Sequence, residues 1–442
     1  MKPNIFLLTI DSIRADRFYG SKKTAITPNF DFITKNGLFF EQNISTSDQT
    51  GTSLASIFTG KYPFNSGVTQ FNFNFEFTTF FDDLRKLGYS LYSCIPDLLI
   101  FQKITKNFKK NIEYVYGKTT TYPHLDNELG DKIVENFLNE KMDEPWLFYS
   151  HLLDLKDPTV WSKKYDDIKF GETTYDRNLS ALDLWIGKFL ENINLENTLF
   201  VITADHGEYV VPESNNLEKS IRKVSEFGKR SQILGRVGKK PFSLSLKIAK
   251  KIKQNRMEEL HESEKRNYHL TRASSELFDD LIKVPLLFIG YNIEKPKNIS
   301  TQTRHVDIFP TIFDLIDQTI TDSSIDGRSN VPLIKNQEFD QMPAYIEAGS
   351  SDPRESGKVV GIRTSDYKYF RSRKNPKENV NLYNLKNDPN EESNIEDGVL
   401  IEKMEKILLE IINKSKSSKN NQITDGEALE LEEELRKMGY ID

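Results

Sequence analysis

The strongest candidates for metal chemistry in this sequence are Asp205 and His206, which directly follow the apolar run NTLFVITA. A carboxylate beside an imidazole suits Zn²⁺, Mn²⁺ or Fe²⁺ better than Ca²⁺, because Ca²⁺ takes oxygen ligands. Gly207 lets the backbone turn sharply after the pair. The alternative is a hydrogen-bonded pair that caps a following helix. Asp11 stands directly after a second apolar run, NIFLLTI, and favours the metal.

A hydroxyl-rich stretch, SDQTGTSLASIFTG at residues 47–60, is a second candidate. Thr50 stands just before SLASIFTG, whose pattern predicts a helix, so its hydroxyl would lie where free backbone amides and the helix dipole favour an anion. A divalent cation touching this hydroxyl would lower its pKa and make it a nucleophile at neutral pH. The alternative is an ordinary threonine helix cap.

Short apolar runs separated by helical patterns predict the elements that position these side chains. The runs are NIFLLTI, GYSLYSCI, PWLFYSH, NTLFVITA and KVPLLFIG, and TPNFDFITKNGLFF has a helical pattern with Pro28 near its start and Gly37 just past its end. This alternation predicts an α/β fold with a mostly parallel sheet sandwiched by helices. Asp11, His151 and the Asp205–His206 pair then lie at the carboxyl edge of three strands, where such sheets bind ligands.

Length and composition restrict the class of protein. The 442 residues are 37% hydrophobic and can bury a large core, and a net charge of −6 with a pI near 5.8 argues against a nucleic-acid partner. The single cysteine, Cys94, excludes an internal disulfide. The first apolar run is too short for a signal peptide, and no later run reaches about 18 residues, so we expect a soluble, cytoplasmic protein. No pattern indicates an oligomeric state.

Changes in composition and in the residue pattern along the chain predict its domain boundaries. We expect a catalytic α/β domain over residues 1–320, interrupted by a basic helical insertion at 213–272. The β-type segments MPAYIEAGS, VVGIRTSDYKYFRSR and NVNLYNL predict a small antiparallel subdomain over 321–395. A charged helical tail is expected over 396–442.

The insertion is strongly basic. Residues 219–256 contain thirteen Lys or Arg and one acidic residue, Glu226, interleaved with apolar residues. One interpretation is contact with an anionic lipid, a glycan or a polyanionic substrate. The alternative is a solvated helical hairpin with a basic face.

Nine segments resemble, in order, successive blocks of the sulfatase family within the alkaline phosphatase superfamily. They are NIFLLTIDSIRADRFYG, TPNFDFITKNGLFFEQNISTS, SLASIFTGKYPFNSGV, FVITADHGE, LFDDLIKVPLLFIG, HVDIFPTIFDLI, IDGRSNVPLI, GIRTSDYKYFRSR and NLYNLKNDPNEESNI. The resemblance covers nearly the whole chain apart from the basic insertion. It implies an alkaline phosphatase-like α/β sandwich with a C-terminal subdomain, a metal-bound nucleophile, and hydrolysis or transfer of a phosphate or sulfate ester.

Position by position, the resemblance implies that Asp11, Asp205 and His206 are metal ligands. It also implies that Thr50 occupies the position of the metal-bound nucleophile. His151 matches the first His of the block after the third strand, where it either binds substrate or supports the metal ligands. The resemblance implies one divalent cation, because no second cluster of histidines is evident. Mn²⁺ or Zn²⁺ is favoured, with Ca²⁺ or Mg²⁺ as alternatives.

The chain departs from the family at several positions. A sulfatase carries Cys-x-Pro-Ser-Arg, whose Cys is oxidised to formylglycine, but residues 50–54 read TGTSL and Cys94 lies elsewhere. Ser12 replaces the second acidic ligand, and His206 replaces an Asn. The resulting set of Asp, Thr, Asp and His is similar to that of phosphoglycerol and phosphoethanolamine transferases and of phosphodiesterases in the superfamily.

The substrate's negative charge needs cations around it in the transition state. The family's Arg after the nucleophile is Leu54 here, and the His of its DPHxP pattern is Lys156. We therefore take Lys156, Arg272, Lys283 and His269 as candidates for binding an anionic ester.

These observations predict a metal-dependent hydrolase or transferase of phosphate monoesters or diesters. The reaction would pass through a covalent Thr50 intermediate, with His151 or Lys156 stabilising the leaving oxygen. The alternatives are a sulfuric ester hydrolase, favoured by overall family likeness, and a degenerate member that binds an anion without catalysis.

Overall fold

The computed structural model describes residues 2–69, 78–115, 124–139, 142–156, 160–211, 258, 260–270, 274–320, 322–349 and 358–414. The chain divides into two compact units, one formed by Met1–Tyr209 with Arg272–Asp442 and the other by Val210–Thr271. The second unit contains helix α11 (Glu262–His269). None of the described helices combines the length and the apolar character needed to cross a bilayer.

A nine-stranded sheet forms the centre of the first unit, in the order β4-β3-β5-β1-β6-β7-β2-β8, with β9 also paired to β2. Its strands are β1 (Asn4–Ile10), β2 (Leu38–Ile44), β3 (Ser90–Pro96), β4 (Lys110–Tyr114), β5 (Trp146–Leu152), β6 (Thr198–Thr203), β7 (Lys283–Gly290), β8 (Lys297–Ile299) and β9 (Thr303–Arg304). β1 runs parallel to its neighbours β5 and β6, with Thr9 opposite both His151 and Thr203. The mostly parallel sheet that the sequence predicts is confirmed.

One strand, β7, runs antiparallel to both of its neighbours, β6 and β2. The chain leaves β6 at the carboxyl edge of the sheet and, after the second unit, re-enters it at Lys283. Because it returns to the edge that it left, β7 must run in the opposite direction. Lys283 therefore begins its strand at the edge where β6 ends.

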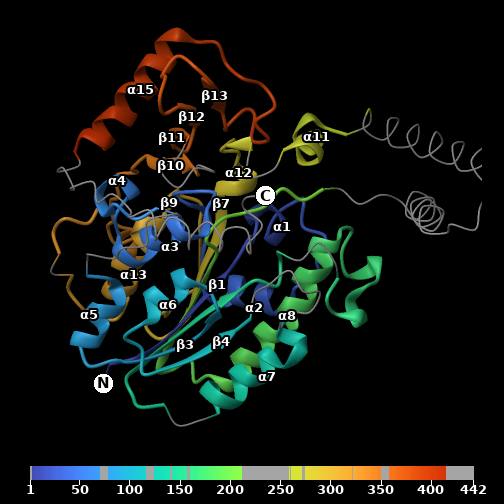
Figure 1. Cartoon of the computed structure of the whole chain (residues 1–442), viewed down its shortest axis with the longest axis vertical. Helices are drawn as coiled ribbons and strands as arrows, with labels where there is room; N and C mark the ends of the chain where they lie inside the picture. Colours follow the sequence, from blue (N-terminus) through green and yellow to red (C-terminus); the bar gives the residue numbers. More distant parts are fainter. Residues whose placement is uncertain are drawn as a thin grey trace, which may run out of the picture. The chain divides into compact units, whose positions relative to one another are not determined.

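Helices cover both faces of the sheet (Figure 1). They are α1 (Ala15–Phe18), α2 (Pro28–Asn36), α3 (Thr50–Thr59), α4 (Pro63–Ser66), α5 (Phe80–Lys86), α6 (Leu99–Thr105), α7 (Gly130–Ile133), α8 (Thr174–Asn192), α12 (Asp279–Ile282), α13 (Ile308–Leu315) and α14 (Val331–Ile334). Side chains alternate along each strand between the two faces. Leu7 belongs to the core shared with α3, α5, α6 and α13, whereas Phe6 packs on the other face, where its ring lies 5.8 Å from that of Phe189 in α8.

The helix expected after Pro28 is α2, and Pro28 occupies its first turn. Gly37 ends it in an extended conformation rather than the left-handed one typical of a glycine cap. A Cβ at Gly37 would lie 2.3 Å from the Phe288 carbonyl oxygen, so close approach to β7 explains the glycine. β2 begins at the next residue, Leu38. The sequence pattern did not predict this strand, because polar residues 41–43 interrupt its apolar run.

The expected antiparallel sheet near the C-terminus is present. It consists of β10 (Ala344–Ala348), β11 (Val359–Arg363), β12 (Tyr367–Ser372) and β13 (Asn381–Asn384), paired in that order. Helix α15 (Gly398–Asn413) packs Met404 and Leu408 into the core of this sheet. Residues 415–442, which include the rest of the predicted helical tail, and the basic segment 219–256 lie outside the described residues.

The C-terminal sheet also contacts the loop that leads into α3. The Glu347 amide, at the end of β10, donates to the Thr46 carbonyl oxygen at 2.8 Å, and Ser47 pairs with Glu347 in a parallel bridge. The Gly349 amide donates to the Asp48 carboxylate at 2.8 Å. The smaller sheet thus holds the segment that presents Thr50.

Candidate active site

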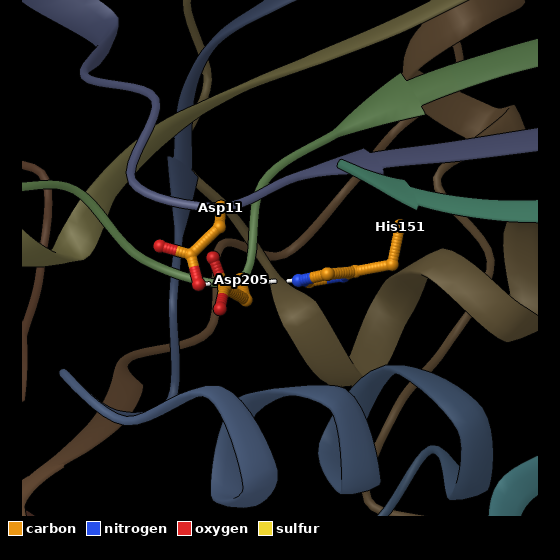
Figure 2. Close-up of side chains that lie close together, drawn as sticks. All are labelled: Asp11, His151 and Asp205. Atoms are coloured by element: carbon orange, nitrogen blue, oxygen red, sulfur yellow. Dashed lines mark ion pairs between the residues drawn. The ribbon is translucent and has the colours of Figure 1, made fainter. Parts of the chain in front are cut away.

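Three adjacent strands end at one point of the sheet edge, and each carries a polar residue there. Asp11 follows β1, His151 is the penultimate residue of β5, and Asp205 lies two residues past β6. The side chains of all three are buried. One ligand atom from each lies within 4.8 Å of the others, so the carboxyl edge assembles a compact group of possible metal ligands (Figure 2).

The charge and bonding of this group fit a cation. Among the described residues, neither Asp205 Oδ2 nor His151 Nε2 has a hydrogen-bond partner, although both atoms are buried. Buried polar atoms normally find a partner, and two buried carboxylates repel each other unless a positive charge lies between them. The residues present therefore suit a divalent ion.

The imidazole of His151 is oriented by its other nitrogen. Nδ1 lies 2.7 Å from Thr9 Oγ1, and the Thr9 hydroxyl has the Ser150 carbonyl oxygen as an acceptor at 3.3 Å. Nδ1 can thus donate to Thr9, which leaves a lone pair on Nε2. That nitrogen points toward the carboxylates and lies 3.9 Å from Asp11 Oδ2 (Figure 2). The structure therefore brings His151 into the group of possible metal ligands.

His206 adds a second imidazole beside the Asp11 and Asp205 carboxylates. Its Nδ1 lies 2.8 Å from the Gly207 carbonyl oxygen, which can only accept, so Nδ1 carries a hydrogen, and in the neutral ring Nε2 carries the lone pair. Nε2 lies 3.3 Å from Asp205 Oδ2 and 3.3 Å from Thr50 Oγ1. The imidazole can therefore accept the Thr50 proton or bind a cation held by Asp205.

Thr50 begins α3, as its sequence context predicts. Its hydroxyl oxygen lies 3.5 Å from Asp11 Oδ2, and the side chain is 5% exposed. Gln49, which precedes it, makes no side-chain cap, and the first turn of α3 contains no acidic residue. The amides of this turn and the helix dipole therefore favour an anion near Thr50.

Ser12 replaces the family's second acidic ligand and organises the two carboxylates instead. Its hydroxyl donates to Asp11 Oδ1, and its amide donates to Asp205 Oδ1 at 3.3 Å. Ser12 has φ of 70°, a conformation that costs energy for a residue other than glycine. The Tyr175 hydroxyl donates to the Ser12 carbonyl oxygen at 2.9 Å and helps to hold this turn.

Lys156 brings a positive charge to the same place. Its ammonium nitrogen lies 3.6 Å from Asp11 Oδ2, and the side chain is 11% exposed. Residue 156 follows β5 by four positions, in a turn closed by its amide and the Leu153 carbonyl oxygen. Lys156 is therefore within reach of a group bound near Asp11.

The other three predicted substrate-binding residues are Lys283, in the first compact unit, His269, in the second, and Arg272, outside the described residues. Lys283 is half-buried, and burial lowers its pKa, while Asp279 raises it and Arg363 lowers it further. Asp279, in α12 (Asp279–Ile282), is the largest electrostatic partner of Lys283. His269 ends α11 in the second compact unit, and Arg272 lies outside the described residues.

Sequence reasoning did not single out His305, a fully buried imidazole that begins the short helix His305–Asp307. Burial and the nearby His206 lower its pKa to about 3, so it is neutral at physiological pH. His305 lies in the block HVDIFPTIFDLI, but nothing in that block of sequence links it to His206.

Comparison with known proteins agrees with this arrangement. The family model described as Sulfatase matches residues 3–318, and the model of the N-sulphoglucosamine sulphohydrolase C-terminal region matches residues 274–418. An uncharacterised protein of Haemophilus influenzae is 28% identical over 213 residues, which are 47% of this chain and 32% of that protein. The match therefore spans about a third of this curated relative.

Solved structures share the fold over nearly its full length. The phosphonate monoester hydrolase of Agrobacterium radiobacter is similar at a TM-score of 0.62 and 15% identity, covering 96% of this chain and 99% of that chain. A protein in complex with its substrate D-glucosamine-2-N,6-O-disulfate is similar at a TM-score of 0.62 and 17% identity, covering 94% and 97% of the two chains.

The fold and the site define an α/β protein with a buried Asp-His-Asp group at the carboxyl edge of its main sheet and a small antiparallel C-terminal sheet. The chain belongs to the sulfatase family, whose model covers most of its length. The family membership that the nine sequence blocks indicate is confirmed.

Proposed function

We propose that this protein hydrolyses or transfers phosphate esters through a covalent intermediate on Thr50, with one divalent cation, Mn²⁺ or Zn²⁺. One observation carries the proposal. The Thr50 hydroxyl, in the first turn of α3, lies 3.3 Å from His206 Nε2 and 3.5 Å from Asp11 Oδ2. A hydroxyl between two bases at a helix N-terminus is suited to attack an anionic ester.

The cation would be held by Asp11, Asp205 and His206, with His151 Nε2 as a further ligand. Bound there, it supplies Lewis-acid chemistry, which withdraws charge from an ester oxygen and lowers the pKa of a neighbouring hydroxyl. Two imidazoles beside two carboxylates favour Mn²⁺ or Zn²⁺ over Ca²⁺ and Mg²⁺.

In the first step, the Thr50 oxygen forms a bond to phosphorus, and its proton passes to Asp11 Oδ2, because the cation would occupy the lone pair of His206 Nε2. The bond from phosphorus to the leaving oxygen breaks, and its electron pair stays on that oxygen. Lys156 is the group proposed to stabilise this oxygen and to give it a proton. In the second step, water or an acceptor alcohol attacks phosphorus and gives its proton to Lys156. The Thr50 oxygen leaves and takes its proton back from Asp11 Oδ2.

Sulfuric ester hydrolysis is the second candidate, because the chain belongs to the sulfatase family. Phosphate is favoured for two reasons. The stretch TGTSL at residues 50–54 lacks the Cys that formylglycine requires. Leu54, which stands where the family has an Arg, is fully buried in the core and offers no charge to a sulfate.

A panel of aryl phosphate monoesters, phosphodiesters, phosphonates and sulfates tests the proposal, with protein purified without chelator and analysed for metal. We expect near-stoichiometric Mn²⁺ or Zn²⁺ and turnover of at least one phosphorus ester. Turnover confined to sulfates would instead support the second candidate. Absence of both metal and turnover would identify a degenerate, anion-binding member of the family.

A further inference from the structure

Helix α12 (Asp279–Ile282) contacts three loops, which carry Asp11, Thr50 and His206. The Leu281 carbonyl oxygen accepts from the Gly207 amide at 2.6 Å, and the Ile282 carbonyl oxygen accepts from the Ser45 amide at 2.7 Å. Gly207 adjoins His206, and Ser45 begins the loop that leads to Thr50. Two successive carbonyl groups of one helical turn therefore hold the His206 loop and the nucleophile loop.

The residue before this pair, Asp280, holds the third loop. Its carboxylate forms an ion pair with Arg14, which lies three residues past Asp11. The Arg14 side chain is 2% exposed and that of Asp280 is 9% exposed, so water screens the pair only weakly. The same guanidinium donates to the Glu208 carbonyl oxygen at 3.1 Å, which ties it to the His206 loop as well.

The backbone of α12 has no free space on the side of the His206 loop. A Cβ added at Gly207 would lie 2.1 Å from the Asp280 carbonyl oxygen. A shift of α12 would therefore displace the His206 loop and, through Asp280 and Arg14, the Asp11 loop.

The first residue of α12, Asp279, anchors the helix to the C-terminal sheet. Its carboxylate accepts from Arg363 of β11 at 3.0 and 2.9 Å and forms an ion pair with Lys368 of β12 at 2.6 Å. Burial raises the pKa of Asp279, but these two cations outweigh it and hold the pKa well below its usual range. Asp279 therefore remains ionised and keeps α12 attached to the sheet.

We infer that Asp280 is a positioning residue, which acts through Arg14 to set the distances among the metal-ligand loops and the nucleophile loop. The inference rests on the proposed function, because it assigns Asp280 to the geometry of that same site. The role of Asp280 is to hold Asp11 and His206 where they converge on one cation.

The test is the affinity of metal-free protein for Mn²⁺, measured by calorimetry without substrate. Residues that orient metal ligands typically change metal affinity by about 10- to 100-fold when they are replaced. We expect Asp280→Asn to weaken Mn²⁺ binding by about tenfold or more. The matched control is Asp16→Asn, which removes the same charge beside the same guanidinium but from α1 rather than from α12. We expect its effect to be clearly smaller.

A second variant, Arg14→Lys, keeps the positive charge but cannot bridge Asp280, Asp16 and Glu208 together, so it should also weaken Mn²⁺ binding. Wild-type affinity in Asp280→Asn, or equal losses in Asp280→Asn and Asp16→Asn, would overturn the inference. Loss of the folded state in both Asp280→Asn and Arg14→Lys, or wild-type protein that binds no Mn²⁺, would also overturn it. Wild-type protein that binds Mn²⁺ but cleaves no ester would refute only the proposed function.

Discussion

The Thr50 hydroxyl oxygen lies 3.3 Å from Nε2 of His206, although the two residues are 156 positions apart in the chain. Thr50 comes from the start of α3, and His206 from the loop after β6. The hydroxyl thus faces a nitrogen that carries a lone pair, because Nδ1 of the same ring is bonded to the Gly207 carbonyl oxygen. This relationship makes Thr50 the first residue to replace.

Thr50→Ala should lower kcat by about three orders of magnitude or more, because it removes the atom that attacks phosphorus. Bound metal should stay near the wild-type level, since Asp11, Asp205 and the two imidazoles remain. Thr50→Ser keeps a hydroxyl in the first turn of α3 and should retain part of the activity. Steady-state kinetics with the best phosphorus ester, together with metal analysis, check this. Wild-type turnover by Thr50→Ala would exclude Thr50 as the nucleophile.

Lys156→Gln should lower kcat/KM for an anionic ester by about 100-fold, because it removes a positive charge 3.6 Å from Asp11 Oδ2. Lys156→Arg should restore part of this loss, since it keeps the charge. An exposed lysine, Lys86, is the control, and Lys86→Gln should have the kinetics of the wild type. Equal kinetics in Lys156→Gln and the control would show that Lys156 does not interact with the substrate.

Gly207→Ala should destabilise the fold by about 1–3 kcal/mol and weaken metal binding, because its Cβ would lie 2.1 Å from the Asp280 carbonyl oxygen. Gly398→Ala is the matched control. A Cβ at Gly398, at the start of α15, meets nothing within 4 Å, so this change should be neutral or slightly stabilising. Chemical denaturation compares the two variants. Equal stability of both would contradict the close approach of the His206 loop to α12.

Asp154 should make unfolding depend on pH in a defined window. Burial raises the pKa of this carboxyl group to about 6, although His124 and the Leu125 amide lower it in part. The native state therefore binds more protons than the unfolded state between about pH 4 and pH 6, and stability falls as pH rises through this window.

Asp154→Asn removes this titration. The wild-type free energy of unfolding should fall relative to that of the variant by at most about 3 kcal/mol between pH 4 and pH 7. Urea denaturation at several pH values measures the difference. A difference that does not change with pH would show that Asp154 ionises equally in the folded and unfolded states.

The expected fold follows from local patterns in the sequence. Strands β1, β3, β5, β6 and β7 appear as apolar runs because both faces of such a sheet are buried, and this leaves nearly continuous hydrophobic segments. Placing Asp11, His151 and Asp205 at the carboxyl ends of parallel strands then predicts that they meet. Thr50 at the start of a helix is also local information, carried by the stretch SDQTGTSLASIFTG.

The sequence does not predict the hydrogen-bond partners of these side chains, because the partners come from segments far apart in the chain. Nothing near His151 in the sequence indicates that Thr9 orients its ring, or that Ser12 donates to both Asp11 and Asp205. The antiparallel course of β7 depends on the chain returning to the edge that it left. The contacts of α12 likewise join four distant segments, so only the folded chain decides how the predicted residues are held.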